Sequence, residues 1–288
     1  MTERNELQQL AYLKVHGAGN DFVLLPDLYD TFTLTEGLVR ALCDRHRGIG
    51  GDGVIRLGQA RGQAADVFMD YHNADGSVAE MCGNGVRTVA KYLVDRGLTE
   101  GHKVAVDTRG GIKDVVCHLG SDGLVQTCTV DMGAPVPQKT SQTLQLPDGT
   151  TVAVTTVSMG NPHAVIVVDD PGTAPVASLG PALAHHPAFP DGTNVEFITV
   201  SDRNTLQGRI WERGVGETLA SGTGGSAMAV AAIMNDLTER QVAVHLPGGV
   251  LDIEWAADTL FVTGPAVEVG CGTLDRSWLA HAAGDAVL

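Results

Sequence analysis

Two short stretches decide how this 288-residue chain folds: Cys82-Gly83-Asn84-Gly85 in its first half and Ser221-Gly222-Thr223-Gly224 in its second. Apolar residues at helical spacing follow each stretch, over Val86–Arg96 and Ser226–Asn235. Each stretch therefore predicts the N-terminal end of a helix. The second helix is rich in Ala and Val and has little polar face, which is typical of a buried helix.

A second pair of motifs repeats in the same order. Gly19-Asn20-Asp21-Phe22 in the first half corresponds to Gly160-Asn161-Pro162-His163 in the second. Asn20 and Asn161 lie 141 residues apart, and Cys82 and Ser221 lie 139 apart. We therefore predict two similar lobes that face each other, each with one reactive side chain directly before a Gly-x-Gly turn. Two such lobes suit a reaction in which one carbon is approached from both faces.

Each half also offers many short strands around its helix, such as Asp66–His72 in the first and Ala164–Val168 in the second. A sheet curled around one central helix is a compact way to bury that helix. The predicted fold class is α+β, with two pseudo-symmetric lobes, each a barrel-like, mostly antiparallel sheet wrapped around a central helix. The active site is expected in the cleft between the lobes. The N-terminal lobe is expected over residues 1–130, completed by about 268–288, and the C-terminal lobe over 131–267.

Composition narrows the class of protein. The net charge of −15 argues against nucleic acid and anionic membranes as partners, because both bind basic surfaces. The five cysteines include no CxxC and no zinc spacing, so neither a disulfide framework nor a metal site is expected. The first residues lack the apolar run of a signal peptide, and no apolar stretch is long enough to cross a bilayer. These features predict a soluble protein of the reducing cytoplasm.

Cys82 is the strongest candidate for a reactive group. It lies at a helix start, where backbone N–H groups and the helix dipole favour a thiolate. The same N–H groups form a cradle suited to a carboxylate. A buried cysteine is more often just a small apolar residue, but the recurrence of the motif at Ser221 favours a functional role. No P-loop occurs, and no G-x-G-x-x-G in a βαβ context, so no nucleotide cofactor is expected.

Four asparagines in distinctive settings, together with Glu212 and Arg213, predict a polar pocket. The asparagines are Asn20, Asn73, Asn161 and Asn194. Taken singly, each is more often a turn residue, and in the alternative interpretation Glu212 and Arg213 form a surface ion pair. Arg213 offers a bidentate grip on a carboxylate. His163 precedes a strand and is a candidate for tuning a proton.

With these residues in place, the chain resembles the diaminopimelate epimerase family along essentially its full length. Six ordered motifs carry the resemblance: HGAGNDFVLL, CDRHRGIGGDG, NADGSVAEMCGNGVR, MGNPHAVIV, GTNVEF and WERGVGETLASGTG. It implies epimerisation of LL-diaminopimelate to meso-diaminopimelate, for lysine and peptidoglycan precursor synthesis, commonly by a homodimer. In this family two cysteines flank the α-carbon. One thiolate removes the α-proton while the other thiol protonates the opposite face, without pyridoxal phosphate or metal.

Carried over residue by residue, the resemblance implies a set of site residues. Cys82 takes the first cysteine position and Ser221 the second, and His163 and Glu212 support this acid–base pair. The implied substrate-binding residues are Asn20, Asn73, Asn161, Asn194 and Arg213. The helix starts that hold the reacting carboxylate are Gly83, Asn84, Gly222 and Thr223. The implied partner is a small amino-acid substrate, with no cofactor and no metal.

Two departures from the family pattern keep other functions open. Ser221 replaces a cysteine, and a hydroxyl is a much weaker acid than a thiol, so it is poor at deprotonating carbon without an activating base. The serine is either a natural variant or an engineered change made to trap a complex. Gly53 stands where the family usually has Gln. The alternatives are a related amino-acid racemase, a one-base dehydratase, or an amino-acid-binding homologue that has lost one catalytic group.

Overall fold

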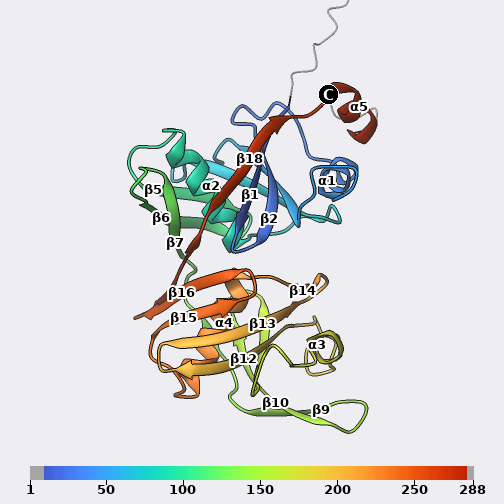
Figure 1. Cartoon of the computed structure of the whole chain (residues 1–288), viewed down its shortest axis with the longest axis vertical. Coiled ribbons are helices and arrows are strands. Elements are labelled where there is room, and N and C mark those ends of the chain that lie inside the picture. The colour runs from blue at the N-terminus through green and yellow to red at the C-terminus, as the bar shows by residue number, and fades with distance from the viewer. Residues whose placement is uncertain (1–9, 284–288) are drawn as a thin grey trace, which may run out of the picture. The chain divides into compact units, whose positions relative to one another are not determined.

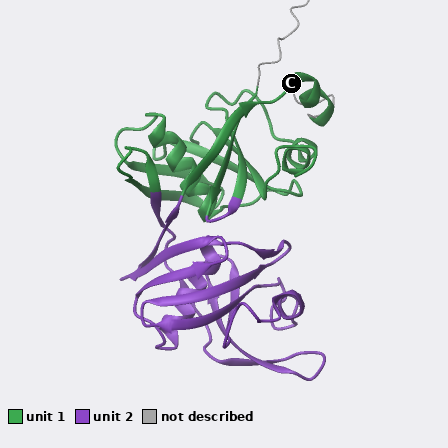
Figure 2. Cartoon of the chain, viewed as in Figure 1, with its two compact units in different colours: residues 1–17, 21–126, 266–288 green, residues 18–20, 127–265 purple. Residues whose placement is uncertain are grey.

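The computed structural model describes residues 10–283, which fold into two compact units (Figure 1). Among the described residues, unit 1 contains residues 10–17, Asp21–Gln126 and residues 266–283. Unit 2 contains Ala18–Asn20 and Thr127–Pro265 (Figure 2). Within residues 10–283, every helix is too short or too polar to span a membrane.

Unit 1 is a mostly antiparallel sheet with a helix packed on it. Its strands are β1 (Ala11–Gly17), β2 (Asn20–Pro26), β3 (Gly53–Gly58), β4 (Val67–Asn73), β5 (Lys103–Thr108), β6 (Gly111–Leu119) and β18 (Val267–Thr273). Hydrogen-bonded neighbours follow the order β18-β1-β2-β3-β4-β5-β6, in which β2–β3 and β4–β5 are parallel. Helix α2 (Gly83–Asp95) packs against β1, β5, β6 and β18. Helices α1 (Glu36–Cys43) and α5 (Arg276–Ala283) pack on each other beside a second apolar cluster.

Unit 2 repeats this plan around helix α4 (Gly222–Met234). Its strands are β8 (Val136–Pro137), β9 (Gln142–Gln145), β10 (Thr151–Ser158), β11 (Pro162–Val167), β12 (Asn194–Asp202), β13 (Thr205–Glu212), β14 (Gly216–Thr218), β15 (Gln241–Leu246), β16 (Gly249–Ala256) and β17 (Thr259–Pro265). The main ladder runs β8-β10-β11-β12-β13-β15-β16-β17 and ends on β7 (Val125–Asp131), with β11–β12 and β13–β15 parallel. Helix α4 contacts strands from β8 at one end of the ladder to β17 near the other, so the sheet wraps around it.

The registers of the two sheets correspond residue by residue. In the parallel pair β2–β3, Phe22 lies opposite Gly53, and in β11–β12, His163 lies opposite Asn194. Both members of the second pair stand 141 positions after those of the first. The later pairs β5–β6 and β15–β16 match in the same way, because Lys103 faces Val116 and Gln241 faces Glu254. The predicted fold class, with its internal repeat, is therefore confirmed at the level of strand pairing.

The glycine-rich start of α4 is required by packing. Every residue from Gly224 to Ala232 is buried, as the Ala- and Val-rich sequence predicted. A Cβ atom on Gly224 would lie 2.2 Å from Ile210 Cδ1 of β13, so only glycine lets the helix approach the sheet this closely. The two central helices begin at Gly83 and Gly222, directly after Cys82 and Ser221, where the repeated motifs predicted helix N-termini.

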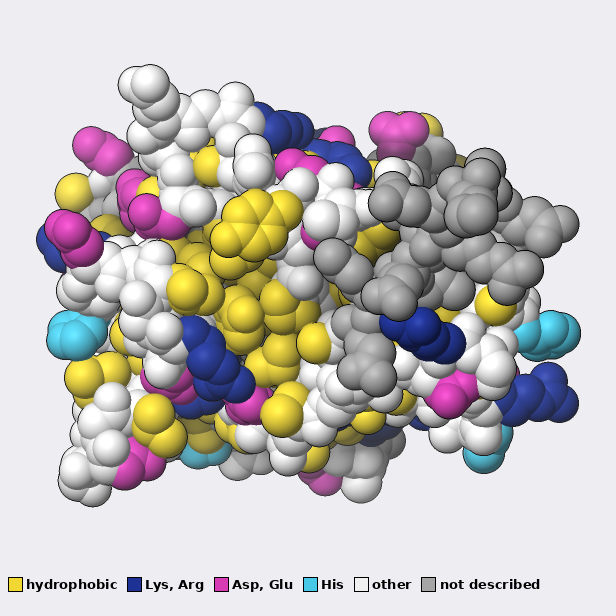
Figure 3. All heavy atoms as spheres, turned by 90° about the horizontal axis from the view of Figure 1, so that it is seen from above, with side chains coloured by type: hydrophobic (Ala, Val, Ile, Leu, Met, Phe, Trp, Pro, Cys, Tyr) yellow, Lys and Arg dark blue, Asp and Glu magenta, His cyan; other side chains and the backbone are white. Residues whose placement is uncertain are grey.

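Apolar side chains also reach the surface. Figure 3 shows a face of the molecule on which apolar side chains gather centrally, with acidic and basic side chains around them. In unit 1, Tyr29 and Val269 are 83% and 63% exposed. In unit 2, Val215 and Leu219 are exposed in the segment between β13 and α4.

Candidate active site

Cys82 and Ser221 occupy the same structural position in the two units. Each is the N-cap residue of a 13-residue helix, α2 for Cys82 and α4 for Ser221. Their backbones are nearly identical, with φ −141° and ψ 115° at Cys82 and φ −137° and ψ 131° at Ser221. Since the first N–H groups of a helix lack partners within the helix, each position combines a reactive side chain with donors suited to an anion.

The start of α2 carries a buried positive charge. Arg87 is fully buried, and its Nη2 donates to Asn84 Oδ1 over 2.6 Å. Its Nη1 lies 3.4 Å from the carbonyl oxygen of Gly83. The guanidinium therefore fixes the side chain of Asn84 and adds positive charge to the N-terminal turn, which favours an anion there. The corresponding residue of α4 is Ser226, whose hydroxyl donates to the carbonyl of Gly222.

The start of α4 is capped by the serine itself. Ser221 Oγ accepts a hydrogen bond from the backbone N–H of Gly224 over 3.2 Å, and it lies 3.4 Å from Thr223 Oγ1. Ser221 is 6% exposed. This is ordinary N-cap geometry for a serine, whereas Cys82 makes no side-chain cap hydrogen bond to its helix.

His163 lies between a carboxyl group and an amide. Its Nδ1 is 2.6 Å from Glu196 Oε1, and its Nε2 is 2.9 Å from Asn161 Oδ1. His163 is 1% exposed and Glu196 is fully buried. Burial raises the pKa of the Glu196 carboxyl; the charge and hydrogen bond of His163 act against this, and the charge of Glu212 adds to it. Both ring nitrogens of His163 are thus engaged within unit 2.

The remaining predicted residues of unit 2 lie at the same end of its sheet. Asn194 is buried at the start of β12, where its Oδ1 accepts the backbone N–H of Arg213 and its Nδ2 donates to the carbonyl of Pro162. The exposed Arg213 guanidinium donates to the carbonyl of Asp191, and within the described residues it forms no ion pair. Glu212 Oε1 accepts the hydroxyl of Thr218 over 2.6 Å. The alternative of a Glu212–Arg213 surface pair is therefore not what the structure shows.

Asn73 lies at the end of β4 in unit 1, and Asn20, which is grouped with unit 2, begins β2. Asn73 ends β4, and its Nδ2 donates to Ser77 Oγ over 3.0 Å, so the side chain is held within a tight turn. Asn20 is half-buried and begins β2 after the left-handed residues Ala18 and Gly19. Gly53 begins β3, where it lies opposite Phe22 in β2 and Asn73 in β4.

Glycine at position 53 is a packing requirement in this chain. A Cβ atom there would lie 2.5 Å from the carbonyl oxygen of His72 and 2.6 Å from the ring of Tyr71. The space beside the backbone is thus taken by Tyr71, which stacks edge-on against Phe22. A glutamine at this position requires a different local arrangement of Tyr71 and the backbone of His72.

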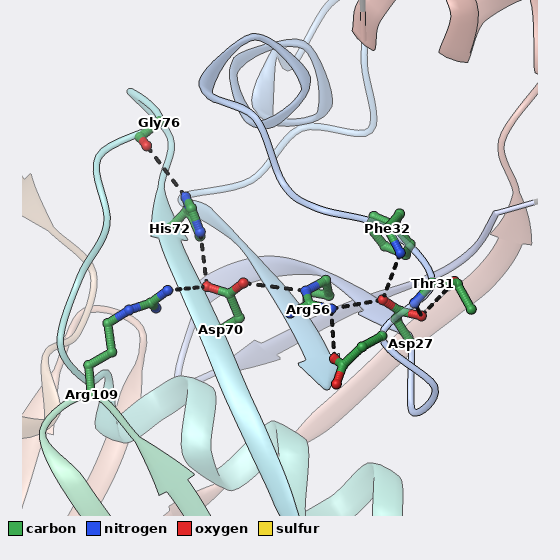
Figure 4. A network of polar contacts seen from close by, with 9 residues as sticks. Asp27, Thr31, Phe32, Arg56, Asp70, His72, Gly76 and Arg109 are labelled. Atoms are coloured by element: carbon green, nitrogen blue, oxygen red, sulfur yellow. Dashed lines mark hydrogen bonds and ion pairs between the residues drawn. The ribbon is translucent and has the colours of Figure 1, made fainter. Parts of the chain in front are cut away.

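A buried ionic network supports the strand that leads to Asn73 (Figure 4). Asp70 accepts hydrogen bonds from Arg109 at 2.8 Å and Arg56 at 3.3 Å, and lies 3.0 Å from His72 Nε2. Arg56 also donates to Asp27 over 2.8 Å. Burial raises the pKa of Asp70, but hydrogen bonds and charge from His72 and Arg109 outweigh it and hold the pKa well below its usual range. The network fixes β4 by charges that remain ionised at neutral pH.

A second ionic cluster fixes the residue next to Asn20. Asp21 accepts hydrogen bonds from Lys14 and, at 2.9 and 2.7 Å, from Arg45, which also donates to Asp52. Burial pushes the pKa of Asp21 upward, but the hydrogen bonds and charges of Arg45 and Lys14 outweigh it and lower the pKa to about 2. The start of β2 is thereby tied to the loop that precedes β3.

Sequence reasoning missed three residues of this arrangement. Glu196 sits inside an apolar strand sequence, Thr218 in a glycine-rich loop, and Arg87 within a helix pattern. Only the GTNVEF motif carried a signal for one of them, since an acidic residue in an otherwise apolar strand requires a partner. The other two depend on the folded geometry.

Comparison with known proteins identifies the family of the chain. The family model described as diaminopimelate epimerase matches residues 12–137 and 155–269. The diaminopimelate epimerase of Leptospira biflexa is 41% identical over 281 residues, which cover 93% of this chain and 99% of that protein. That of Heliobacterium modesticaldum is 44% identical over 284 residues, covering 92% and 99%.

Solved structures share the fold at low sequence identity. A probable proline racemase from Agrobacterium radiobacter gives a TM-score of 0.72 at 17% identity, with 93% of each chain covered. A phenazine biosynthesis protein of the PhzF family from Bacillus anthracis gives 0.69 at 16% identity, covering 93% of this chain and 100% of that one. These likenesses concern the fold alone. The family match and the identity of above 40% to full-length relatives show that the chain belongs to the diaminopimelate epimerase family.

Proposed function

We propose that this protein is an isomerase that epimerises LL-diaminopimelate to meso-diaminopimelate by removing and returning the α-proton. The observation that carries the proposal is the pair of N-cap residues, Cys82 and Ser221, in matching backbone conformations at equivalent helices. The curated relatives, similar over nearly their full length, bear the name of this activity.

The chemistry follows from the two helix starts. The α-proton of an amino acid is far less acidic than any side chain, so the carbanion must be stabilised as it forms. Helix N-termini aimed at the reacting carboxylate stabilise that charge, and the buried guanidinium of Arg87 strengthens one of them. Cys82 and Ser221 act as the two acid–base groups on opposite faces of the α-carbon, which permits inversion while the substrate stays bound. His163 and Glu212 support them.

We propose that the distal end of the substrate is held by the asparagines and Arg213. Arg213 has a guanidinium that is exposed and unpaired with any carboxylate of the described residues, so it is available to a substrate carboxylate. The side-chain carbonyl of Asn161 is engaged by His163, so its amide N–H groups remain as donors.

We also propose a homodimer, for which the exposed apolar side chains of Figure 3 offer a surface. A thiol mechanism at Cys82 requires a reducing compartment, which supports the cytoplasm. The net charge of −15 supports neither nucleic acid nor anionic membranes as partners.

The test is incubation with LL- and meso-diaminopimelate in D₂O, followed by NMR and chiral analysis. Solvent deuterium at the α-carbon and interconversion of the isomers support the proposal. Ser221 favours one second candidate, an amino-acid-binding homologue that has lost a catalytic group. Calorimetric binding of diaminopimelate without any α-proton exchange identifies that candidate. Exchange of another amino acid, or loss of water from it, identifies a racemase or a one-base dehydratase.

Replacing Arg213 with alanine is expected to weaken diaminopimelate binding by about 2 kcal/mol or more, roughly 30-fold in Kd, because one carboxylate loses its charged partner. Calorimetric titration measures this. The matched control is Arg203→Ala, since Arg203 is an exposed arginine of the same unit that is paired with Glu239 and Asp236. Tight binding of alanine or proline, unaffected by Arg213→Ala, contradicts the proposed substrate.

Chelation is expected to leave the reaction unchanged, because the proposed acid–base groups and helix N-termini supply the chemistry without a cofactor. Activity is measured before and after dialysis against EDTA, and the absorbance spectrum of the purified protein is recorded for pyridoxal phosphate. Loss of activity on dialysis that an added metal restores contradicts the expectation.

A further inference from the structure

Glu196, His163 and Asn161 form a continuous chain of hydrogen bonds across unit 2. The chain starts at a carboxyl group that is fully buried on β12, passes through the ring of His163 on β11, and ends at the side chain of Asn161, which is half-buried. The two distances are 2.6 and 2.9 Å. If the proposed function holds, the last member of this chain contacts substrate.

The fold itself does not require this chain of polar groups. The internal repeat places Phe22 at the position of His163 and Ile55 at that of Glu196, because Leu24 faces Ile55 in unit 1 as Val165 faces Glu196 in unit 2. Phe22 and Ile55 are both fully buried. One half of the protein thus fills this place with two apolar side chains. The polar pair in the other half, which is costly to bury, is retained for a purpose other than packing.

The surroundings of Glu196 favour its neutral form. Its Oε2 is buried and has no hydrogen-bond partner among the described residues, so ionisation would leave half of a buried carboxylate unsatisfied. The groups that face it are His163 on β11, Glu212 on β13 and the first turn of α4. The negative charge of Glu212 disfavours a second one. The α4 turn favours an anion, but the N–H of Gly224 is already donated to Ser221 Oγ.

We propose that Glu196 is a positioning residue: as a neutral carboxylic acid it donates to His163 Nδ1, so that His163 carries its proton on Nε2 and donates it to Asn161 Oδ1. The amide of Asn161 then has one orientation, with its N–H₂ group turned to the substrate. A flipped amide would present its oxygen to a substrate carboxylate and repel it. Glu196 and His163 therefore favour a carboxylate at the position that Asn161 contacts, without touching the substrate themselves.

The protonation pattern is tested on the parent protein by ¹⁵N NMR of the imidazole rings. The signal of His163 is identified among the ten histidines by its loss in His163→Gln. The expected spectrum at neutral pH shows a protonated Nε2 and an unprotonated Nδ1. Two protonated nitrogens at neutral pH, or a proton on Nδ1 alone, overturn the proposal.

The effect on binding is tested with Glu196→Gln and Glu196→Leu. The Gln variant can still donate to Nδ1 and is expected to bind meso-diaminopimelate with a Kd within about threefold of the parent. The Leu variant removes the hydrogen bond, and its Kd is expected to rise about tenfold. Glu254→Leu, at an exposed position of β16, is the matched control. An unchanged Kd in Glu196→Leu, or equal losses in both Glu196 variants, overturns the proposal.

The two proposals fail in different ways. A parent protein that binds neither isomer of diaminopimelate overturns the proposed function, and the His163 spectrum still decides how Glu196 is protonated. A parent protein that binds diaminopimelate and exchanges its α-proton, but has a charged His163 ring, overturns the proposed role of Glu196. The proposed function is then unaffected.

Discussion

Replacing Cys82 with alanine is expected to abolish α-proton exchange, with a loss of at least about 10³-fold. Positioned acid–base groups typically contribute 10²- to 10⁴-fold, and removal of the proton-abstracting thiolate leaves one face of the α-carbon without a base. The thiolate form is favoured at this position by the N-terminus of α2 and by the buried Arg87. Exchange of the α-hydrogen in D₂O, followed by NMR for both isomers, measures the loss.

Cys43→Ala is the matched control for this variant. Cys43 is buried in the apolar cluster around α1, and burial raises the pKa of its thiol to about 12, so it has no thiolate at neutral pH. Its replacement should cost a little stability and leave exchange intact. A Cys82→Ala protein as active as the parent removes Cys82 from the mechanism.

Replacing Ser221 with cysteine is expected to raise the rate of epimerisation by orders of magnitude. In the parent protein, proton transfer on this side depends on a hydroxyl, whereas a thiol ionises far closer to neutral pH. Residual exchange in the parent should therefore favour the isomer whose α-hydrogen faces Cys82. Rates in both directions, measured for the two proteins, give the result.

The same change should lower stability. Ser221 Oγ accepts the N–H of Gly224, and loss of a serine N-cap costs about 1 kcal/mol, measurable by urea denaturation. A gain in turnover with a loss in stability separates the catalytic effect from a general improvement in folding. If the serine protein is already as fast as the cysteine variant, Ser221 is an evolved acid–base residue and the two-thiol mechanism does not apply to this chain.

The repeated motifs predicted the fold in outline because hydrophobic periodicity is a local signal. Both central helices were predicted with their N-terminal ends at the Cys82 and Ser221 motifs, where the structure begins them, although Gly83 and Gly222 have low helix propensity. Helix α3 (Val176–Ala184) was missed because Gly180 and Pro181 resemble helix breakers. Gly180 is needed there, since a Cβ atom would lie 2.7 Å from the side chain of Trp211.

The residues of the candidate site that lie in local sequence motifs were predictable. Those that are brought together only by contacts between distant segments were not. The N-cap positions of Cys82 and Ser221 follow from the sequence, because a helix start is encoded locally. The partner of His163 does not, since Glu196 stands 33 residues further along and is brought close only by the pairing of β11 with β12.

The placement of β18 has a consequence for biosynthesis. This strand follows all of unit 2 along the chain, yet it pairs with β1 near the beginning. On the ribosome, most of unit 1 is therefore made first, but its sheet is completed last. Throughout translation of unit 2, the outer edge of β1 waits without a neighbour, and such open edges promote association between nascent chains. Slow or interrupted translation after Pro265 should expose this edge longest. Pairing of β18 with β1 then covers the edge and lowers the tendency of the newly made protein to aggregate.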